Sequence, residues 1–394
     1  MRSLLLTLLA FGATTALAEQ DSPVTFNVGY ALQTDSNLFR LPSGFKTKTG
    51  ESVAAEQIGV TTLGLGLATT QSLQRFELDA SLVDYRYQNF DYLNFTATNL
   101  DAAWHWSLTP QLTGNLTGTR KETYNTFIDY QSYNERNRRT NTSSRLDMLY
   151  ELNGPWHLLA GIAQADQRNE LAVLVGGGES RSTGAELGMR YNYGSGSTIA
   201  VVGKLANGSY IDRIVPNTDL YDDSYKQLDT RLQLHWVFSG TTTLDGSLSS
   251  INRSHPTYAQ RDYNGLNIDA ALNWALSGKT RIKAQFTRGL EAYARTDSNY
   301  MQIDRLQVGT VWVIGPKTQL TFNQIWTHFD FLGSPGAITS QRHDLFNDSI
   351  LSIGWDPMPH LRLNAGLQTS SRASTQATLN FDSTMVNLAA QYSY

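Results

Sequence analysis

Histidines beside a hydroxyl or a carboxylate are the residues of this sequence best suited to acid–base chemistry. A hydrolytic site needs a nucleophile, a base and an orienting group within hydrogen-bond reach of one another. The chain has 7 His, and no spacing among them brings three such groups together. We therefore predict no catalytic residue and no enzyme activity. The pairs considered are Ser254 with His255, His328 with Asp330, and His343 with Asp344.

The sequence gives little indication of a metal site or of a nucleic-acid partner. Asp219, Asp222 and Asp223 offer oxygen ligands but lack the D-x-D-x-D-G spacing of a calcium loop. The chain has no Cys, which removes a thiolate metal site. A net charge of −4 is too small to indicate a nucleic-acid partner. We predict no metal site, no cofactor and a solvated acidic loop.

Most charges instead alternate with apolar residues, as they do from Arg75 to Leu82. A period of two puts the two kinds of residue on opposite faces of a β-strand. Because charges at every second position cannot lie in lipid, we expect the charged face to line an aqueous lumen. The acidic candidates are Glu77, Asp79, Asp101, Asp147, Glu151, Glu186, Asp229, Asp245, Asp269 and Asp348. The basic candidates are Arg75, Arg145, Arg190, Lys204, Arg231, Arg281, Lys283, Arg305 and Arg362.

The two signs nearly cancel along this face. A pore that selects strongly for one sign of ion would show a one-sided ring of charge. The functional interpretation is a hydrophilic path for bulky neutral or weakly charged solutes. Ladders of salt bridges that only stiffen the wall explain the same residues equally well.

The alternation recurs along the whole chain and continues to the last strand, 385–394, where Val386, Leu388, Tyr392 and Tyr394 share one face. An apolar face of this kind is covered most simply by lipid, and a sheet in lipid must close on itself to leave no unpaired edge. About eight short and about nine long connections predict an all-β, antiparallel, up-and-down transmembrane barrel of about 18 strands, with sixteen as the alternative. In outer-membrane barrels, an aromatic-terminated last strand is the signal for the barrel assembly machinery.

The remaining composition agrees with a bacterial outer-membrane barrel. Charged residues make up 17% of the chain, below the roughly 25% of soluble domains. A charged start, a short apolar run and the Ala16-Leu17-Ala18 site predict a signal peptide over 1–18, followed by one barrel over 19–394. An array of soluble β-sandwiches is the alternative fold. Two aromatic girdles are expected at the lipid interfaces. The girdle residues beside the short turns are Trp106, Trp156, Trp236, Trp274, Trp312 and Trp355. The girdle residues beside the long loops are Tyr85, Tyr87, Tyr92, Tyr124, Tyr293 and Tyr300.

A barrel of about eighteen strands leaves an aqueous channel unless something fills it. The loop 34–57 is the longest candidate for a constriction. Within it, Asp35, Asn37, Phe39 and Arg40 are candidates for a gate at the mouth. Because Asp and Asn are strong local turn-formers, a structural clasp is the simpler interpretation.

Two stretches resemble a known family. TDSNLFRLP at 34–42 is similar to the D-x-N-L-F-R-L-P segment of β-barrel porins encoded with exopolysaccharide biosynthesis genes, the EpsL type. YRYQNFDYLNF at 85–95 is similar to that family's R-Y-x-x-F-x-Y-L-x-F hairpin. The resemblance implies an outer-membrane conduit for a secreted polysaccharide that works with periplasmic polysaccharide export proteins. A diffusion porin for small hydrophilic solutes is the alternative, and a barrel that acts on lipid or polymer is a third.

Overall fold

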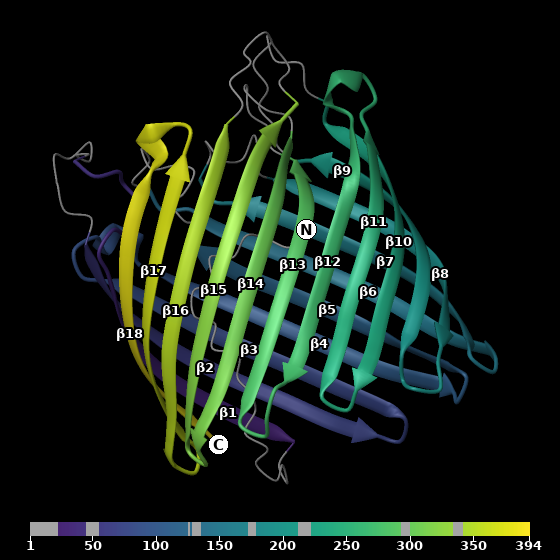
Figure 1. Ribbon diagram of the computed structural model, residues 1–394, viewed down its shortest axis with the longest axis horizontal. Helices are drawn as coiled ribbons and strands as arrows, with labels where there is room; N and C mark the ends of the chain where they lie inside the picture. The colour runs from purple at the N-terminus through teal and green to yellow at the C-terminus, as the bar shows by residue number, and fades with distance from the viewer. Residues whose placement is uncertain are drawn as a thin grey trace.

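The chain forms one closed antiparallel sheet of eighteen strands. The computed structural model describes residues 23–44, 55–124, 127, 135–171, 179–211, 222–292, 300–333 and 342–394 (Figure 1). The expected signal peptide at 1–18, Asp219 and Tyr293 lie outside these residues, as does the side chain of Tyr124. The prediction of an all-β barrel of about eighteen strands is confirmed, and the alternatives of sixteen strands and of separate sandwiches are wrong.

The strands follow one another around the barrel in sequence order. The first nine are β1 (Val24–Asp35), β2 (Glu56–Gln71), β3 (Gln74–Tyr87), β4 (Phe95–Thr109), β5 (Leu112–Tyr124), β6 (Arg138–Asn153), β7 (Trp156–Asn169), β8 (Ser180–Asn192) and β9 (Thr198–Tyr210). The others are β10 (Ser224–Ser239), β11 (Thr242–Ser254), β12 (Tyr263–Ala275), β13 (Thr280–Ala292), β14 (Tyr300–Gly315), β15 (Thr318–Leu332), β16 (His343–Met358), β17 (Leu361–Ser374) and β18 (Phe381–Ser393). Short turns join them at one end of the barrel, the turn end, and long connections at the other, the loop end.

Three of the long connections contain a single turn of 3₁₀-helix: η1 (Asp91–Leu93), η2 (Ala259–Arg261) and η3 (Ala377–Leu379). Among the described residues, no helix has the length and apolar character needed to cross a membrane. In outer-membrane barrels the short turns face the periplasm and the long loops face the cell exterior.

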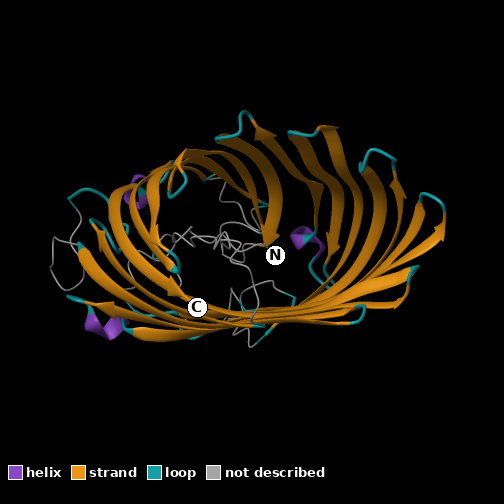
Figure 2. Ribbon diagram, turned by 90° about the horizontal axis from the view of Figure 1, so that it is seen from below, coloured by secondary structure: helices purple, strands orange, loops and turns teal. Residues whose placement is uncertain are grey.

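Pairing of β1 with β18 closes the sheet, which Figure 2 shows as a flattened ring of strands. The N–H of Phe26 donates to the carbonyl of Tyr394 at 2.7 Å, and the N–H of Tyr394 donates back at 2.8 Å. Closure leaves no row of unpaired backbone groups, which hydrocarbon could not solvate.

The outer wall is apolar because the strand register places the apolar residues, which stand at every second position, on the outside of the barrel. Phe26, Val28 and Tyr30 on β1 each keep more than half of their surface exposed, and each lies opposite another outward residue on β2. A slip of one residue would turn this set inward. The exposed apolar belt is the surface that a lipid bilayer covers, so the barrel is that of a bacterial outer-membrane protein.

The girdle at the turn end is formed on the outer wall, where Trp156, Trp274, Trp312 and Trp355 are exposed. The prediction for Tyr85 and Tyr87 is wrong. These two tyrosines share the parity of Glu77, so they point into the barrel, and Tyr87 is buried there. Proximity to a loop indicates the end of a strand but not the face of the sheet.

Two apolar clusters lie inside the barrel wall at the loop end. The first, here the N-terminal cluster, contains Leu38, Phe39, Leu41, Ile58, Val60, Tyr87, Phe90, Leu93 and Phe127. The second, here the C-terminal cluster, contains Ile303, Phe329, Phe331, Phe346 and Phe381. Their strand residues have the inward parity, so both clusters take up lumenal space near the outer mouth.

Candidate functional site: the lumenal wall

All nineteen charged candidates from the alternation lie on strands with the parity opposite to the exposed apolar set, which places them on the lumenal face. Six of them line one cavity of ≈ 710 Å³ near the turn end, along β3 to β10. These six are Arg75, Arg145, Asp147, Glu186, Arg190 and Arg231. His105, Asn115 and Gln233 also line it, and only their inward parity could have singled them out.

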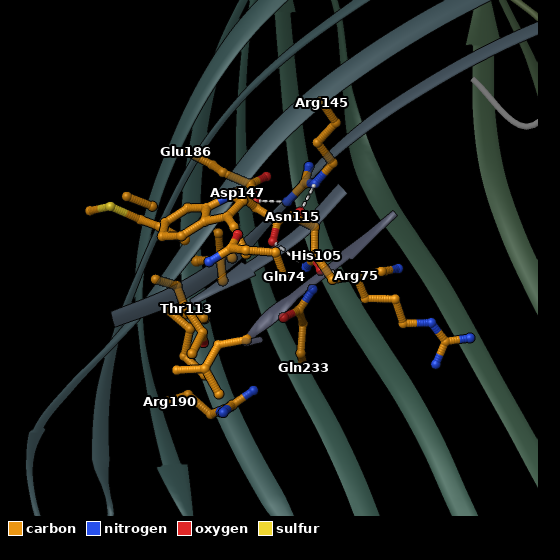
Figure 3. Close-up of a pocket in the computed structure, with 18 of the residues that line it drawn as sticks. Gln74, Arg75, His105, Thr113, Asn115, Arg145, Asp147, Glu186, Arg190 and Gln233 are labelled. Atoms are coloured by element: carbon orange, nitrogen blue, oxygen red, sulfur yellow. Dashed lines mark hydrogen bonds and ion pairs between the residues drawn. The ribbon is translucent and has the colours of Figure 1, made fainter. Parts of the chain in front are cut away.

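Arg145 is the centre of an ion-pair network in this cavity (Figure 3). Its guanidinium lies 3.2 Å from Asp147 on its own strand and forms a second ion pair with Glu186 of β8. The side-chain amide of Asn115 donates to Asp147 at 2.9 Å. Asn115 and Asp147 face each other across β5 and β6, and Arg145 and Asp147 alternate along β6, which are spacings at which side chains of a sheet meet. The pair of Arg145 with Glu186 instead spans β7, where Gly161 lies between Asp147 and Glu186 and has no side chain to block it.

The network continues to β3 through His105. The Nδ1 of His105 lies 2.6 Å from the Oδ1 of Asn115, and its Nε2 lies 3.6 Å from Glu77. Arg75 in turn pairs with Glu77 at 2.6 Å. The carboxylates of this wall are therefore engaged by its own cations, as expected of a ladder that stiffens the sheet.

Arg190 differs from the other arginines of the cavity. Arg231 pairs with Asp229 at 2.8 Å, whereas Arg190 forms no ion pair with any described residue. Its Nε is buried and has no hydrogen-bond partner within the described chain. Arg190 itself is only partly buried. Because a buried polar atom without a partner is costly, Arg190 is the cation of this wall that is best placed to bind an anionic group of a solute.

The remaining lumenal candidates lie apart from the cavity. Asp79 and Asp101 face each other across β3 and β4, with Lys121 at 3.6 Å from Asp101. Asp269 accepts a hydrogen bond from Gln285, and Arg362 lies 3.4 Å from Asp356. Arg281, Lys283 and Arg305 face the lumen from β13 and β14. The structure thus distributes the charges over the wall and does not collect them in one ring.

The gate candidates form a compact turn against the inner wall. Arg40 donates to both carboxylate oxygens of Asp35, at 2.9 and 2.8 Å, and to Ser383 of β18 at 2.9 Å. The Asn37 side chain donates to the carbonyls of Leu41 and Asp382. These contacts tie the end of β1 to the start of β18, which is the arrangement of a clasp at the barrel seam.

Phe39 continues this turn into the N-terminal cluster. It is fully buried, and its ring meets those of Phe90 and Phe127 edge-on at 4.7 Å each. The carboxylate of Glu56, itself buried, accepts the backbone N–H groups of Asn89 and Phe90. Three loops are thereby held against one sector of the lumen.

The histidine pairs form no triad. Adjacent residues of a strand point to opposite faces, so His343 and Asp344 cannot pair, and the expectation that they could is wrong. Asp344 faces the lumen, where Arg342 and Arg372 both contact it at 2.6 Å. His343 and His328 instead meet Asp330 on the outer wall, and His255 lies 3.2 Å from Asp262 in a loop.

Asp222 is buried in a contact between loops, so the prediction of a solvated acidic loop is wrong for this residue. The carboxylate of Asp222 accepts the backbone N–H groups of Thr257 and Tyr258, at 3.1 and 2.8 Å for the nearer oxygens. Three residues of the proposed assembly signal, Val386, Leu388 and Tyr392, lie in β18, and Tyr394 follows it directly; all four are exposed.

The fold is similar to that of several solved structures, although no family model and no curated protein sequence matches the chain. Pseudomonas aeruginosa OccK2 (OpdF) in complex with glucuronate is 14% identical, with a TM-score of 0.53, over 95% of this chain and 98% of that one. A BenF-like porin from Pseudomonas fluorescens Pf-5 is 12% identical, with a TM-score of 0.53, over 95% and 99%. Pseudomonas aeruginosa OpdK with vanillate is 12% identical, with a TM-score of 0.52, over 94% and 99%.

These similarities extend over the whole barrel. At such low sequence identity they support a conclusion about the fold alone. They support the predicted fold of an outer-membrane barrel. The chain has the fold of an outer-membrane porin.

Proposed function

We propose that the chain is a diffusion porin for small hydrophilic solutes, carboxylates among them. The observation that carries this proposal is the cavity beside Arg190, on the wall of a barrel whose strand number is typical of water-filled channels. Four arginines line the cavity, and its two carboxylates already pair with Arg145. The solutes bound by two relatives of the fold, vanillate and glucuronate, are carboxylates as well.

The structure at the loop end supports the proposal that the solute is small. The N-terminal and C-terminal clusters take up lumenal space on two sectors of the wall, and their side chains are well buried. Both clusters lie on the arc of the wall that runs from β14 through β18 to β3, and the lumenal space that they occupy is not open to a solute that enters from that side. An entrance narrowed in this way favours compact molecules over a continuous polymer.

The test is permeation through the purified full chain. We expect stepwise current in planar bilayers, and vesicle swelling with monosaccharides and glucuronate that falls off steeply for longer oligosaccharides. Replacing Arg190 by Gln should slow glucuronate and leave neutral monosaccharides unchanged. Absence of current in every salt would contradict the porin, and equal passage of long and short sugars would contradict its size limit.

A polysaccharide export conduit is the second candidate, and its support is the resemblance of residues 34–42 and 85–95. The two stretches pack together through Phe39 and Phe90, so they form one unit of structure. This candidate adds periplasmic export proteins and a polysaccharide as partners. Deleting the gene and measuring surface polysaccharide tests it, because unaltered secretion contradicts export. For either candidate, we also propose that the barrel assembly machinery recognises the outer face of β18 before insertion into outer-membrane lipid.

A further inference from the structure

The outer wall carries a group of side chains that a channel does not need. His328 and Asp330 alternate along β15, and His343 lies directly opposite Asp330 on β16. All three share the outward parity of the exposed residues Trp326 and Leu345. They follow Trp326 toward the loop end, and the outward-facing pair Leu332 and Tyr300 follows them.

The three side chains converge on one point. The Nδ1 of His343 lies 2.5 Å from the Oδ1 of Asp330, and the Nε2 of His328 lies 3.4 Å from the same oxygen. The two imidazole rings are nearly parallel, with centroids 6.1 Å apart. One donor atom from each residue lies within 4.8 Å of the other two.

We propose that His328, Asp330 and His343 form a binding site for a divalent transition-metal ion such as Zn²⁺. Two imidazoles and one carboxylate are a donor set that suits Zn²⁺, Cu²⁺ and Ni²⁺, whereas Mg²⁺ and Ca²⁺ require oxygen donors. Bonds of about 2.0 Å to a tetrahedral ion place donor atoms about 3.3 Å apart. His328 and His343 are 45% and 40% exposed, so small rotations of their side chains reach this spacing.

The two histidines are the described ion-pair partners of Asp330, and Arg288 also acts on it electrostatically. The nearest other acid on this face is Asp304, opposite His328, and it is held by Arg288 through two hydrogen bonds at 2.6 and 2.5 Å. The ion would replace the hydrogen bonds within the group and would link β15 to β16 at the loop end.

Zinc binding to the purified full chain, prepared without a histidine tag, tests the proposal. We expect calorimetry to show one Zn²⁺ per barrel, and His328→Gln or His343→Gln to weaken binding by at least about tenfold. His235→Gln is the matched control, because His235 faces Asp245 at 2.6 Å without a second imidazole nearby. Zinc should also raise the unfolding temperature of the wild type and not that of the His328→Gln, His343→Gln double variant.

The following outcomes would support or overturn the metal site. Unchanged affinity in the double variant, or equal loss in the His235 control, would overturn the site. A variant that fails to fold would be recognised on a gel, because it would lack the heat-modifiable band of the folded barrel. In that case the Asp330→Asn variant, which keeps both imidazoles, provides the second measurement. Weaker binding by this variant while the barrel stays folded supports the site, and unchanged binding overturns it. Because the site lies outside the lumen, its failure leaves the porin proposal untouched.

Discussion

Arg40 and Asp35 form a bidentate ion pair on the inner wall, and both side chains are almost fully buried. The pair lies where the end of β1 meets the start of β18, so it joins the two strands that close the barrel. Arg40 has a φ of 56°, a left-handed conformation that costs a non-glycine residue roughly 1 kcal/mol. The contacts of its guanidinium with Asp35 and Ser383 offset this cost.

Replacing Arg40 by Asn should therefore destabilise the barrel. Asn tolerates the left-handed backbone, so the substitution removes the charge without adding strain. Leaving Asp35 buried and unpaired costs about 3–5 kcal/mol in comparable cases, and we expect a lower midpoint in urea unfolding. The control is Arg86→Gln, since Arg86 pairs with Asp84 at 2.6 Å on the exposed outer wall and should change stability by less than about 1 kcal/mol. Equal midpoints for both variants would contradict the clasp.

Phe39→Ala tests whether the N-terminal cluster restricts the lumen. Truncation of a fully buried Phe costs about 3–5 kcal/mol and removes the ring that joins three loops. We expect single-channel conductance to become larger and noisier. Phe76→Ala on the outer wall is the control, because Phe76 is 39% exposed and has no lumenal contact. Lower stability with unchanged conductance would show that the cluster is structural only.

The fold could be predicted from the sequence because one repeated rule controls it. In a barrel wall each strand has a lipid side and a lumen side, so parity along Arg75 to Leu82 already decides where every side chain points. The same rule placed the charged candidates on the lumenal face. Hydrogen bonding across the seam then follows from the need to leave no edge in lipid.

Two features could not be predicted from the sequence. These are the packing of loop residues inside the barrel at the loop end and the contacts between side chains of different strands. Phe39, Phe90 and Phe127 belong to three separate loops, and loop packing has no periodic pattern that would bring them together. His343 was paired with its neighbour Asp344, although the register sets it opposite Asp330. The cavity around Arg190 likewise depends on which residues of β3 to β10 share a level, and register cannot be read from one strand alone.

Ion selectivity should respond to Arg190. Neutralising it by Arg190→Gln removes the cation that lacks an ion pair in the cavity, and we expect the reversal potential in a salt gradient to shift toward cations. The shift should shrink as salt rises, because mobile ions screen lumenal charge. Arg288→Gln on the outer wall is the control and should leave the reversal potential unchanged. An equal shift in both variants would contradict a role for the cavity in selecting ions.

The contact between Asp222 and residues 257–258 should loosen in acid. Burial alone would raise the pKa of Asp222, but the N–H groups of Tyr258 and Thr257 stabilise its carboxylate and hold the pKa below the ordinary value of 3.8. Burial lowers the pKa of His255 from its ordinary value of 6.5, and the hydrogen bond with Asp262 offsets this in part. Both groups bind a proton more readily when the loops are open, so acid favours opening.

The two shifts act in different pH windows. The contribution of His255 is complete above about pH 6.5 and is lost as the pH falls through its lower folded value, whereas that of Asp222 persists to below about pH 4. We expect amide hydrogen exchange of His255, Thr257 and Tyr258, corrected for its intrinsic pH dependence, to show protection that falls in two steps. His255→Gln should remove the upper step and keep the lower one, while Asp222→Ala should reduce protection by about tenfold or more at neutral pH, since it removes hydrogen bonds to a charged acceptor. Protection that is constant from pH 7 to 3 would contradict the coupling, because neither group could then differ in proton affinity between the closed and open loops.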